Sequence, residues 1–262
     1  MSMQKVFSRS PLWKDMPSPY CPGCGHGIVH RLVCELLEEY QVSDDCVFMA
    51  PVGCSILAYT FLSVDVCQPA HGRTPAAATG VRRARPDTFV LSYQGDGDLA
   101  AIGTAEIIHA ANRGENITTI FVNNAIYGMT GGQMAPTTLI GQKATTCPDG
   151  RAPETGMGYP IRVCELLQSL GGVRYLARVS VHNAANVIRA RKAMKKAFEV
   201  QINRQGFSLV EVLSPCPVNW GLAPRKALEF VAGNMMAYYP LGEFKVDGKA
   251  VVPGASGGTA AA

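Results

Sequence analysis

Apolar residues recur along the chain in two patterns, which predict helices alternating with buried strands. A spacing of three and four residues predicts a helix over 26–40 and a longer one over 183–203. A stretch rich in Ala and Gly predicts another helix over 71–83. Short apolar runs predict five strands, over 47–51, 88–93, 117–122, 173–179 and 208–213.

The second and third of these strands are joined by a predicted helix over 99–113, with Asp98 as its cap and Gly114 as its end. A strand, a helix and a strand in short succession form adjacent parallel strands. The predicted fold class is therefore α/β, with a mostly parallel sheet and helices on both of its faces.

The remaining segments define the expected domain organisation. Residues 127–160 are rich in Gly, Thr and Pro and weakly periodic, and a loop of that length is usually functional. Residues 1–20 are expected to form an N-terminal arm, 21–240 one domain, and 241–262 a flexible C-terminal tail.

Composition narrows the possible classes of function. The chain has 262 residues, of which 47% are hydrophobic and 17% charged, and its net charge of +4 is too small to favour nucleic acid as a partner. No apolar run is long enough to predict a membrane span, and the N-terminus lacks the features of a signal peptide, so a cytoplasmic location is expected. Nine cysteines without an export signal favour metal or cluster binding over disulfides.

Polar residues follow two neighbouring predicted strands and indicate a cation and diphosphate site. Gly95-Asp96-Gly97-Asp98 follows one strand and Asn123-Asn124 the next, so both lie at the carboxyl edge of the sheet. Asp96, Asn124 and the Ile126 carbonyl would supply three oxygen ligands to Mg²⁺, and diphosphate oxygens would supply others. The amides of Gly97 and Asp98 and the start of the following helix favour a diphosphate. Alone, Gly-Asp-Gly also fits a plain turn.

The cysteines fall into three groups. Cys21 and Cys24 form a chelating C-x-x-C pair, for which a metal, a redox dithiol or idle thiols all remain open. Cys54 and Cys216 follow predicted strands at the same edge as the cation site, so the four could lie together. Three others are expected in the core and two are undecided; these are Cys34, Cys46 and Cys164, and Cys67 and Cys147.

Taken in order, the motifs resemble those of a known family, the thiamine-diphosphate-binding β subunit of 2-oxoacid:ferredoxin oxidoreductases. The similarity runs from about residue 17 to 240. It rests on Cys21-Pro-Gly-Cys24-Gly-His, Val52-Gly53-Cys54-Ser55, Ala70-His71-Gly72-Arg73, Gly95-Asp96-Gly97-Asp98, Asn123-Asn124-Ala-Ile-Tyr127-Gly128-Met-Thr130-Gly131-Gly132-Gln133 and Ser214-Pro-Cys216. The resemblance implies that Cys21, Cys24, Cys54 and Cys216 hold a [4Fe–4S] cluster beside thiamine diphosphate and Mg²⁺.

The resemblance also implies an activity, the oxidative decarboxylation of a 2-oxo acid to acyl-coenzyme A and carbon dioxide, with electrons passing through the cluster to ferredoxin. The Asn123–Thr138 segment and Tyr238-Tyr239-Pro240-Leu241-Gly242 are most similar to the branched-chain (2-oxoisovalerate) and 2-oxoglutarate types, and of these two the branched-chain type is preferred. Two other classes stay open: a non-oxidative thiamine diphosphate decarboxylase or synthase subunit with a structural zinc, and a noncatalytic scaffold.

Further site residues are expected around the cofactor. His71 and Arg73 are candidate catalytic cations near the substrate carboxylate or the diphosphate, although His71 also fits an ordinary loop histidine. His26, His30 and His109 lie on predicted helices and are expected to be structural. The expected cofactor-binding set is Cys54, Ser55, His71, Gly95, Asp96, Gly97, Asp98, Asn124, Ile126, Tyr127, Gly128, Thr130 and Gly131.

Partners are expected because one essential group is missing from the pattern. In the resembled family the glutamate that activates the aminopyrimidine lies on a separate pyrimidine-binding domain, and a chain of this length is filled by the diphosphate-binding domain. The resemblance thus implies an α-type subunit carrying that domain, a γ-type subunit and a ferredoxin-like δ subunit. A heteromer that dimerises is expected.

Overall fold

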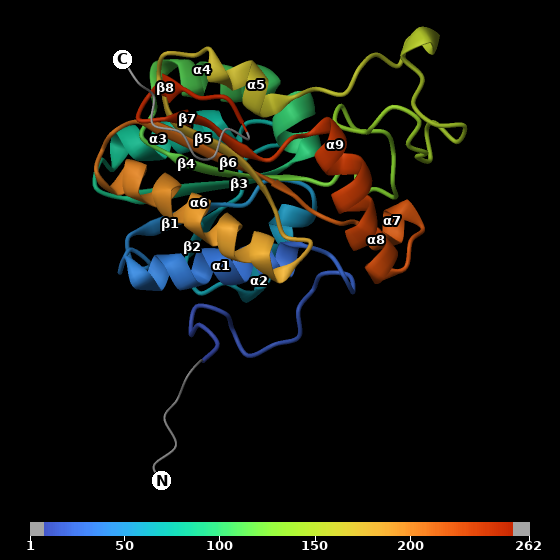
Figure 1. The fold of residues 1–262 in the computed structure, drawn as a ribbon. Helices are drawn as coiled ribbons and strands as arrows, with labels where there is room; N and C mark the ends of the chain where they lie inside the picture. Colours follow the sequence, from blue (N-terminus) through green and yellow to red (C-terminus); the bar gives the residue numbers. More distant parts are fainter. Residues whose placement is uncertain (1–7, 254–262) are drawn as a thin grey trace.

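The computed structural model describes residues 8–253, which form an eight-stranded sheet in the order β2-β1-β3-β4-β6-β5-β7-β8 (Figure 1). The strands from β2 through β5 in that order are parallel, and β7 and β8 add antiparallel to the β5 edge. The strand bounds are β1 (Cys46–Met49), β2 (Asp65–Cys67), β3 (Phe89–Gly95), β4 (Thr118–Asn123), β5 (Val173–Ser180), β6 (Phe207–Leu213), β7 (Gly242–Val246) and β8 (Lys249–Ala250).

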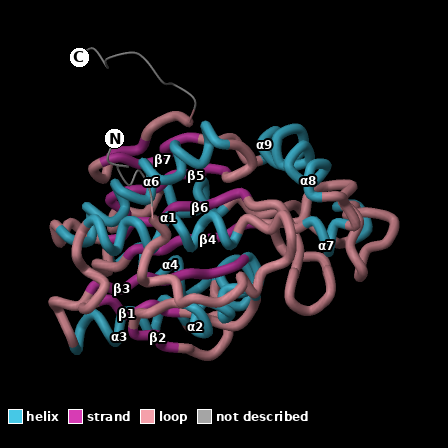
Figure 2. Tube along the Cα trace, turned by 90° about the horizontal axis from the view of Figure 1, so that it is seen from below, coloured by secondary structure: helices cyan, strands magenta, loops and turns pink. Residues whose placement is uncertain are grey.

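Helices cover both faces of the sheet, as predicted. On one face α1 (His26–Glu39) packs beside α6 (Ala184–Ile202), and on the other lie α3 (Thr74–Ala84), α4 (Thr104–Arg113) and α5 (Val163–Gln168) (Figure 1). The short helices α7 (Pro217–Trp220), α8 (Pro224–Phe230) and α9 (Met236–Tyr238) gather at one end of the sheet with the long loops (Figure 2). A fourth short helix, α2 (Ala58–Phe61), lies apart from them.

The central strand β4 is buried on both faces, which explains why the strands appear in the sequence as nearly continuous apolar runs. All its residues are buried. Ile120 and Val122 belong to the core beneath α1 and α6, whereas Phe121 belongs to the core beneath α3, α4 and α5. A strand with helices on both faces needs apolar side chains on both. None of the helices that the structure describes has the length and apolar composition of a membrane crossing.

The helix predicted over 99–113 differs from the structure at its start. A π-helical turn, η2 (Gly97–Ile102), precedes α4, and the two meet at Gly103. Asp98 caps nothing here, which corrects the prediction, because its carboxylate accepts hydrogen bonds from neighbouring loops instead. At Gly103 an added Cβ would lie 2.3 Å from the Asp98 carbonyl oxygen, so only glycine fits the junction.

The predicted ends of the domain also need correction. The segment expected to be a flexible tail from residue 241 instead pairs through β7 and β8, with Phe244 and Lys245 buried; residues 254–262 lie outside the described residues. In the arm, residues 1–7 also lie outside them, and Trp13 packs on Phe61 with ring centroids 4.5 Å apart. Too few residues alternate in β7 and β8 for the pattern to predict strands.

A buried ion network joins three elements below the carboxyl edge. The fully buried Arg178 donates from Nε to Glu211 at 2.8 Å and from Nη2 to Glu165 at 2.6 Å. Glu211 in turn accepts a hydrogen bond from the side chain of Asn123 at 2.8 Å. Asn123 therefore has a structural role, and its neighbour Asn124 is the member of the Asn-Asn pair that faces the site.

Replacing Arg178 with Met should lower the free energy of unfolding by about 3–5 kcal/mol, because it leaves the carboxylate of Glu211 buried without its cation. Urea denaturation measures the change. The control is Arg204→Met, which breaks an exposed pair with Asp87 and should cost under about 1 kcal/mol. Equal effects of the two substitutions would contradict this reading of the network.

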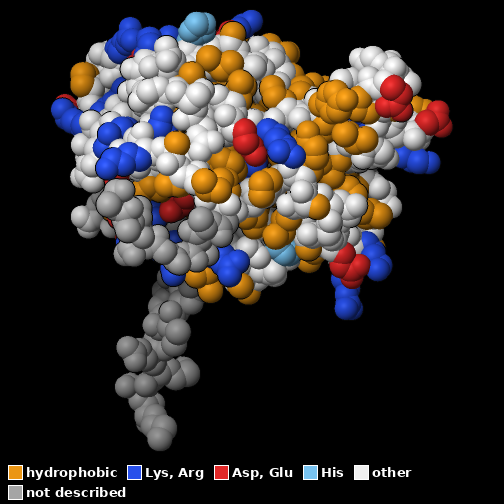
Figure 3. All heavy atoms as spheres, turned by 45° about the horizontal axis from the view of Figure 1, so that its top comes forward, with side chains coloured by type: hydrophobic (Ala, Val, Ile, Leu, Met, Phe, Trp, Pro, Cys, Tyr) orange, Lys and Arg blue, Asp and Glu red, His pale blue; other side chains and the backbone are white. Residues whose placement is uncertain are grey.

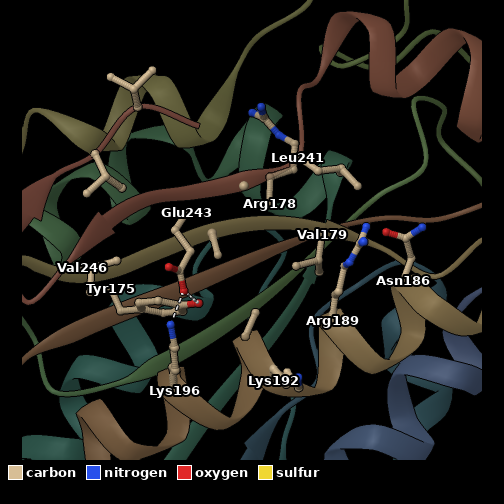
Figure 4. Close-up of a pocket in the computed structure, with 15 residues that line it drawn as sticks. Tyr175, Arg178, Val179, Asn186, Arg189, Lys192, Lys196, Leu241, Glu243 and Val246 are labelled. Atoms are coloured by element: carbon tan, nitrogen blue, oxygen red, sulfur yellow. Dashed lines mark hydrogen bonds and ion pairs between the residues drawn. The ribbon is translucent and has the colours of Figure 1, made fainter. Parts of the chain in front are cut away.

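A groove of about 720 Å³ lies between α6 and β7 (Figure 4). Lys196 crosses it to pair with Glu243 at 2.6 Å, and Glu243 also accepts from Tyr175 at 2.8 Å. The groove shares no lining residue with the cavity at the carboxyl edge, described next.

Candidate functional site

A cavity of about 190 Å³ opens at the carboxyl edge of the sheet, where the loops after β1, β3 and β4 meet. Most of the residues expected at the site line it, including Cys54, Ser55, His71, Gly95, Asp96, Gly97, Asp98, Asn124, Tyr127, Gly128 and Thr130. Ile126, Gly131 and Arg73 are not among them. Exposed apolar side chains of Val52, Ile102 and Met129 also line it. On the face seen in Figure 3, apolar side chains gather toward the long loop.

Three oxygen donors converge at one wall of the cavity. β3 and β4 pair in parallel with Gly95 opposite Val122, which sets Asp96 beside the end of β4. The side-chain amide of Asn124 lies between the carbonyl oxygen of Ile126 and the carboxylate of Asp96. In the orientation that satisfies the amide, its nitrogen donates to Ile126 at 2.6 Å and to the two Asp96 oxygens at 3.2 and 3.3 Å.

Such a set of oxygens fits a divalent cation. Burial raises the pKa of Asp96 to about 6, although hydrogen bonds from Thr137 and from backbone N–H groups act to lower it. The same Asn124 amide, turned over, would present its oxygen to a cation held by the buried Asp96 carboxylate. A carboxylate, a carboxamide oxygen and a carbonyl oxygen are the donors that Mg²⁺ takes.

His71 is held at the cavity by a buried carboxylate. Its Nδ1 lies 2.7 Å from Asp98 Oδ1, so the ring donates to that oxygen. Asp98 also accepts from the backbone N–H of Gly72 at 2.6 Å and from the side chains of Thr74 at 3.1 Å and Gln94 at 2.6 Å. The carboxylate thus anchors the loop before α3, which fixes His71 against the cavity.

Arg73 takes a different direction from the one expected. It sits at the start of α3, and its guanidinium pairs with Glu106 on α4, with the Arg73 side chain half exposed. The structure therefore does not bring Arg73 together with His71 in the cavity lining.

The start of η2 lies at the cavity, where Gly97 leaves room beside the backbone. A Cβ at Gly97 would lie 3.1 Å from the Tyr127 ring, so glycine lets this ring close over the turn. Tyr127 begins a tight loop, with its N–H donating to the Gln133 carbonyl at 3.0 Å. Backbone N–H groups at the start of a helix are suited to an anion, and π-turns are frequent at functional sites.

The four cysteines expected to act together do lie near one another. Burial, together with the charges of Cys216, Cys54 and Cys21, raises the pKa of Cys24 to about 12. Burial likewise raises the pKa of Cys54 to about 11, with Cys216 and Cys21 acting in the same direction. Thiols that affect each other in this way share one region, and deprotonating them together needs compensating positive charge.

Among residues 8–253, no three His, Cys, Asp or Glu side chains are placed to hold a single metal ion. Four cysteines are the ligand set of a [4Fe–4S] cluster, which ligates each cysteine to a different iron.

The three cysteines that were predicted to lie in the core are buried there. Cys34, Cys46 and Cys164 are fully buried in the core. Of the undecided pair, Cys147 is buried and Cys67 is partly buried at the end of β2.

Two residues at the site were not singled out from the sequence. His26, expected to be structural, is 2% exposed and pairs through Nδ1 with the Tyr93 hydroxyl at 2.7 Å, but it also lines the cavity. Burial lowers its pKa to about 4, which keeps the ring neutral. Asn219 contacts both the cysteines and the cofactor loop. His26 directly follows Cys24-Gly25 in the sequence, and this position could have indicated a place at the site. No such pattern surrounds Asn219.

Comparison with known proteins gives a family match. Residues 52–212 match the sequence model of the thiamine pyrophosphate enzyme, C-terminal TPP binding domain. That range begins beside Cys54 and runs to β6, so it contains the three-oxygen site.

Several curated proteins are similar over most of the chain. The ketoisovalerate oxidoreductase subunit VorA of Methanothermobacter thermautotrophicus is 46% identical over 93% of this chain and 51% of its own length. The chain therefore spans about half of that relative. The 2-oxoglutarate synthase subunit KorB of Methanocaldococcus jannaschii is 36% identical over 90% of this chain and 86% of its own length.

A solved structure has the same fold. The 2-oxoglutarate:ferredoxin oxidoreductase from Magnetococcus marinus, with 2-oxoglutarate, coenzyme A and succinyl-CoA bound, matches with a TM-score of 0.71 and 30% identity. The match covers 82% of this chain and 69% of that one.

Proposed function

The chain belongs to the thiamine pyrophosphate enzymes, among the subunits of 2-oxoacid oxidoreductases, and we propose that it forms the diphosphate-binding half of a site that oxidatively decarboxylates a 2-oxo acid. One observation carries the proposal. The three-oxygen site of Asp96, Asn124 and Ile126 and the cysteine group reach the same cavity, because Cys54 lines it beside Asp96.

The residues of this chain divide the binding of the cofactor between them. Asp96, Asn124 and the Ile126 carbonyl would hold Mg²⁺, and the N–H groups at the start of η2 would receive the diphosphate. Bound there, thiamine diphosphate supplies an electron sink for the carbanion left by decarboxylation. His71, fixed by Asp98, offers a polar ring at the wall, and Val52, Ile102 and Met129 give the cavity an apolar rim.

The cysteine group supports oxidation rather than simple decarboxylation. Cys21, Cys24, Cys54 and Cys216 would hold a [4Fe–4S] cluster, which accepts one electron at a time. A non-oxidative decarboxylase has no use for such a group at its cofactor. Coenzyme A, bound in the Magnetococcus marinus enzyme, would receive the acyl group here too, and ferredoxin would accept the electrons.

The proposed protein works in a complex. The exposed apolar rim of the cavity suits a partner subunit that carries the pyrimidine-binding domain, and the relatives are named as subunits. We place a γ-type subunit and a ferredoxin-like δ subunit in the same assembly, which would dimerise. The cysteines of the described chain are all free, which agrees with a reducing compartment such as the cytoplasm.

The substrate is proposed to be a branched-chain 2-oxo acid, since identity to the ketoisovalerate subunit is 46% and to the 2-oxoglutarate subunit 36%. The complex, purified anaerobically from its native host, should reduce viologen in a coenzyme A-dependent reaction. We expect 2-oxoisovalerate to be turned over with the highest kcat/KM among pyruvate, 2-oxoglutarate, 2-oxoisovalerate and arylpyruvates.

Two outcomes of this assay would count against the proposal in different ways. Preference for 2-oxoglutarate would overturn the substrate class and leave the reaction in place. Carbon dioxide release without any electron acceptor, from protein that contains zinc and no iron, would overturn the reaction itself.

A further inference from the structure

One side chain connects the cysteine group to the cofactor loop. The carboxamide nitrogen of Asn219 donates to the Gly128 carbonyl oxygen at 2.9 Å and lies 3.3 Å from the sulfur of Cys216. The Gly128 oxygen and the Cys216 sulfur both accept hydrogen bonds, and the side-chain amide of Asn219 has two N–H hydrogens, one for each. We propose that Asn219 is a positioning residue that raises the reduction potential of the cluster on Cys216 while holding the cofactor loop beside it, an inference that rests on the proposed function.

The short helix α7 puts Asn219 in this position. Cys216 precedes the helix, Pro217 begins it, and the Cys216 carbonyl accepts from the Trp220 N–H at 3.0 Å. The Trp220 ring then donates from Nε1 to the Asn124 carbonyl oxygen at 3.1 Å. One helical turn therefore touches both a proposed cluster ligand and a proposed magnesium ligand, which fixes the distance between the two sites.

The cofactor loop approaches the cysteines closely at one residue. A Cβ at Gly128 would lie 3.3 Å from Cys54 Sγ and 3.6 Å from Asn219 Nδ2. At Gly132 a Cβ would lie 3.3 Å from that of Asn219. The loop backbone thus runs against Cys54 and Asn219 together, and the hydrogen bond from Asn219 to Gly128 secures this contact.

The direction of the effect on the cluster follows from charge. Adding an electron makes the cluster and its thiolates more negative, and an N–H donor to sulfur stabilises that state, so it raises the potential.

The test measures the cluster potential in the anaerobically purified complex, by redox titration followed by electron paramagnetic resonance. Asn219→Leu keeps the approximate size of the side chain and removes its donor. We expect a more negative midpoint potential with unchanged iron per chain, and weaker binding of thiamine diphosphate. Asn219→Gln retains a donor and should recover part of the shift. The control is Asn234→Leu, at an exposed position in η4 (Val231–Met235), which should match the wild type.

The outcomes separate this inference from the proposed function. Wild-type protein without iron would sink both. Four-iron protein in which Asn219→Leu leaves the potential unchanged would overturn the role of Asn219 alone. If Asn219→Leu fails to assemble the cluster, Asn219→Asp decides, because it places a carboxylate at the sulfur. A potential at or above the wild-type value in that variant would then contradict the inference.

Discussion

Replacing Asp96 with Asn should leave a folded protein that has lost its magnesium and thiamine diphosphate. The amide keeps an oxygen for the Thr137 hydroxyl, which donates to Asp96 at 2.8 Å, but it removes the negative charge. Substitution of residues that only orient metal ligands costs about 10–100-fold in affinity or activity. Loss of a direct ligand should therefore lower the activity of the assembled complex by at least about 100-fold.

Stability distinguishes loss of the site from loss of the fold. Asp96 is buried, and burial raises its pKa, so its charge opposes folding when no cation is present. Without magnesium, Asp96→Asn should unfold at a urea concentration no lower than the wild type. Asp149→Asn, at an exposed position of the long loop, is the matched control and should keep full activity. An Asp96→Asn complex that binds the cofactor normally would refute the assignment of the cation site.

Replacing Cys24 with Ser should remove the cluster and end electron transfer. Its thiol lies among those of Cys21, Cys54 and Cys216, and a hydroxyl is a poor ligand for iron. The iron content of the complex should fall by about four atoms for each copy of this chain. Coenzyme A-dependent viologen reduction should fall to background.

Cys67→Ser is the control for that experiment. Cys67 is also a free, partly buried cysteine at the end of a strand, but on β2 at the edge of the sheet. It should keep its iron and its activity. If Cys67→Ser lost as much iron as Cys24→Ser, the assignment of ligands would be wrong.

The sequence predicts which residues meet at the candidate cation site, because their positions follow a simple rule of topology. Asp96 and Asn124 each follow a buried strand, and parallel neighbours bring their carboxyl ends to one edge. The same rule places Cys54 and Cys216 there. Apolar runs were sufficient to predict β1, β3, β4, β5 and β6, and spacing or composition to predict α1, α3, α4 and α6, whereas β2 and α5 were not predicted.

Residues whose role depends on long-range contacts could not be predicted in the same way. Asn219 lies on a helix of one turn, too short for any periodic signal, and its partner Gly128 is 91 positions away. Asp98 stands where a helix cap is expected, but its buried carboxylate accepts hydrogen bonds from Gly72 and Gln94 instead of capping the helix. Arg73 finds Glu106 on the neighbouring helix, a contact that no local pattern encodes.

The most direct test of the account is whether a 2-oxo acid reduces the cluster. The anaerobic complex, loaded with thiamine diphosphate and magnesium, is mixed with 2-oxoisovalerate, with coenzyme A, or with both, and the visible absorbance of the cluster is followed. We predict bleaching that is fast and complete only when both are present, and none in the Asp96→Asn complex. Absence of bleaching in a wild-type complex that contains iron and still releases carbon dioxide would contradict the claim that the cofactor and the cysteines form one redox site.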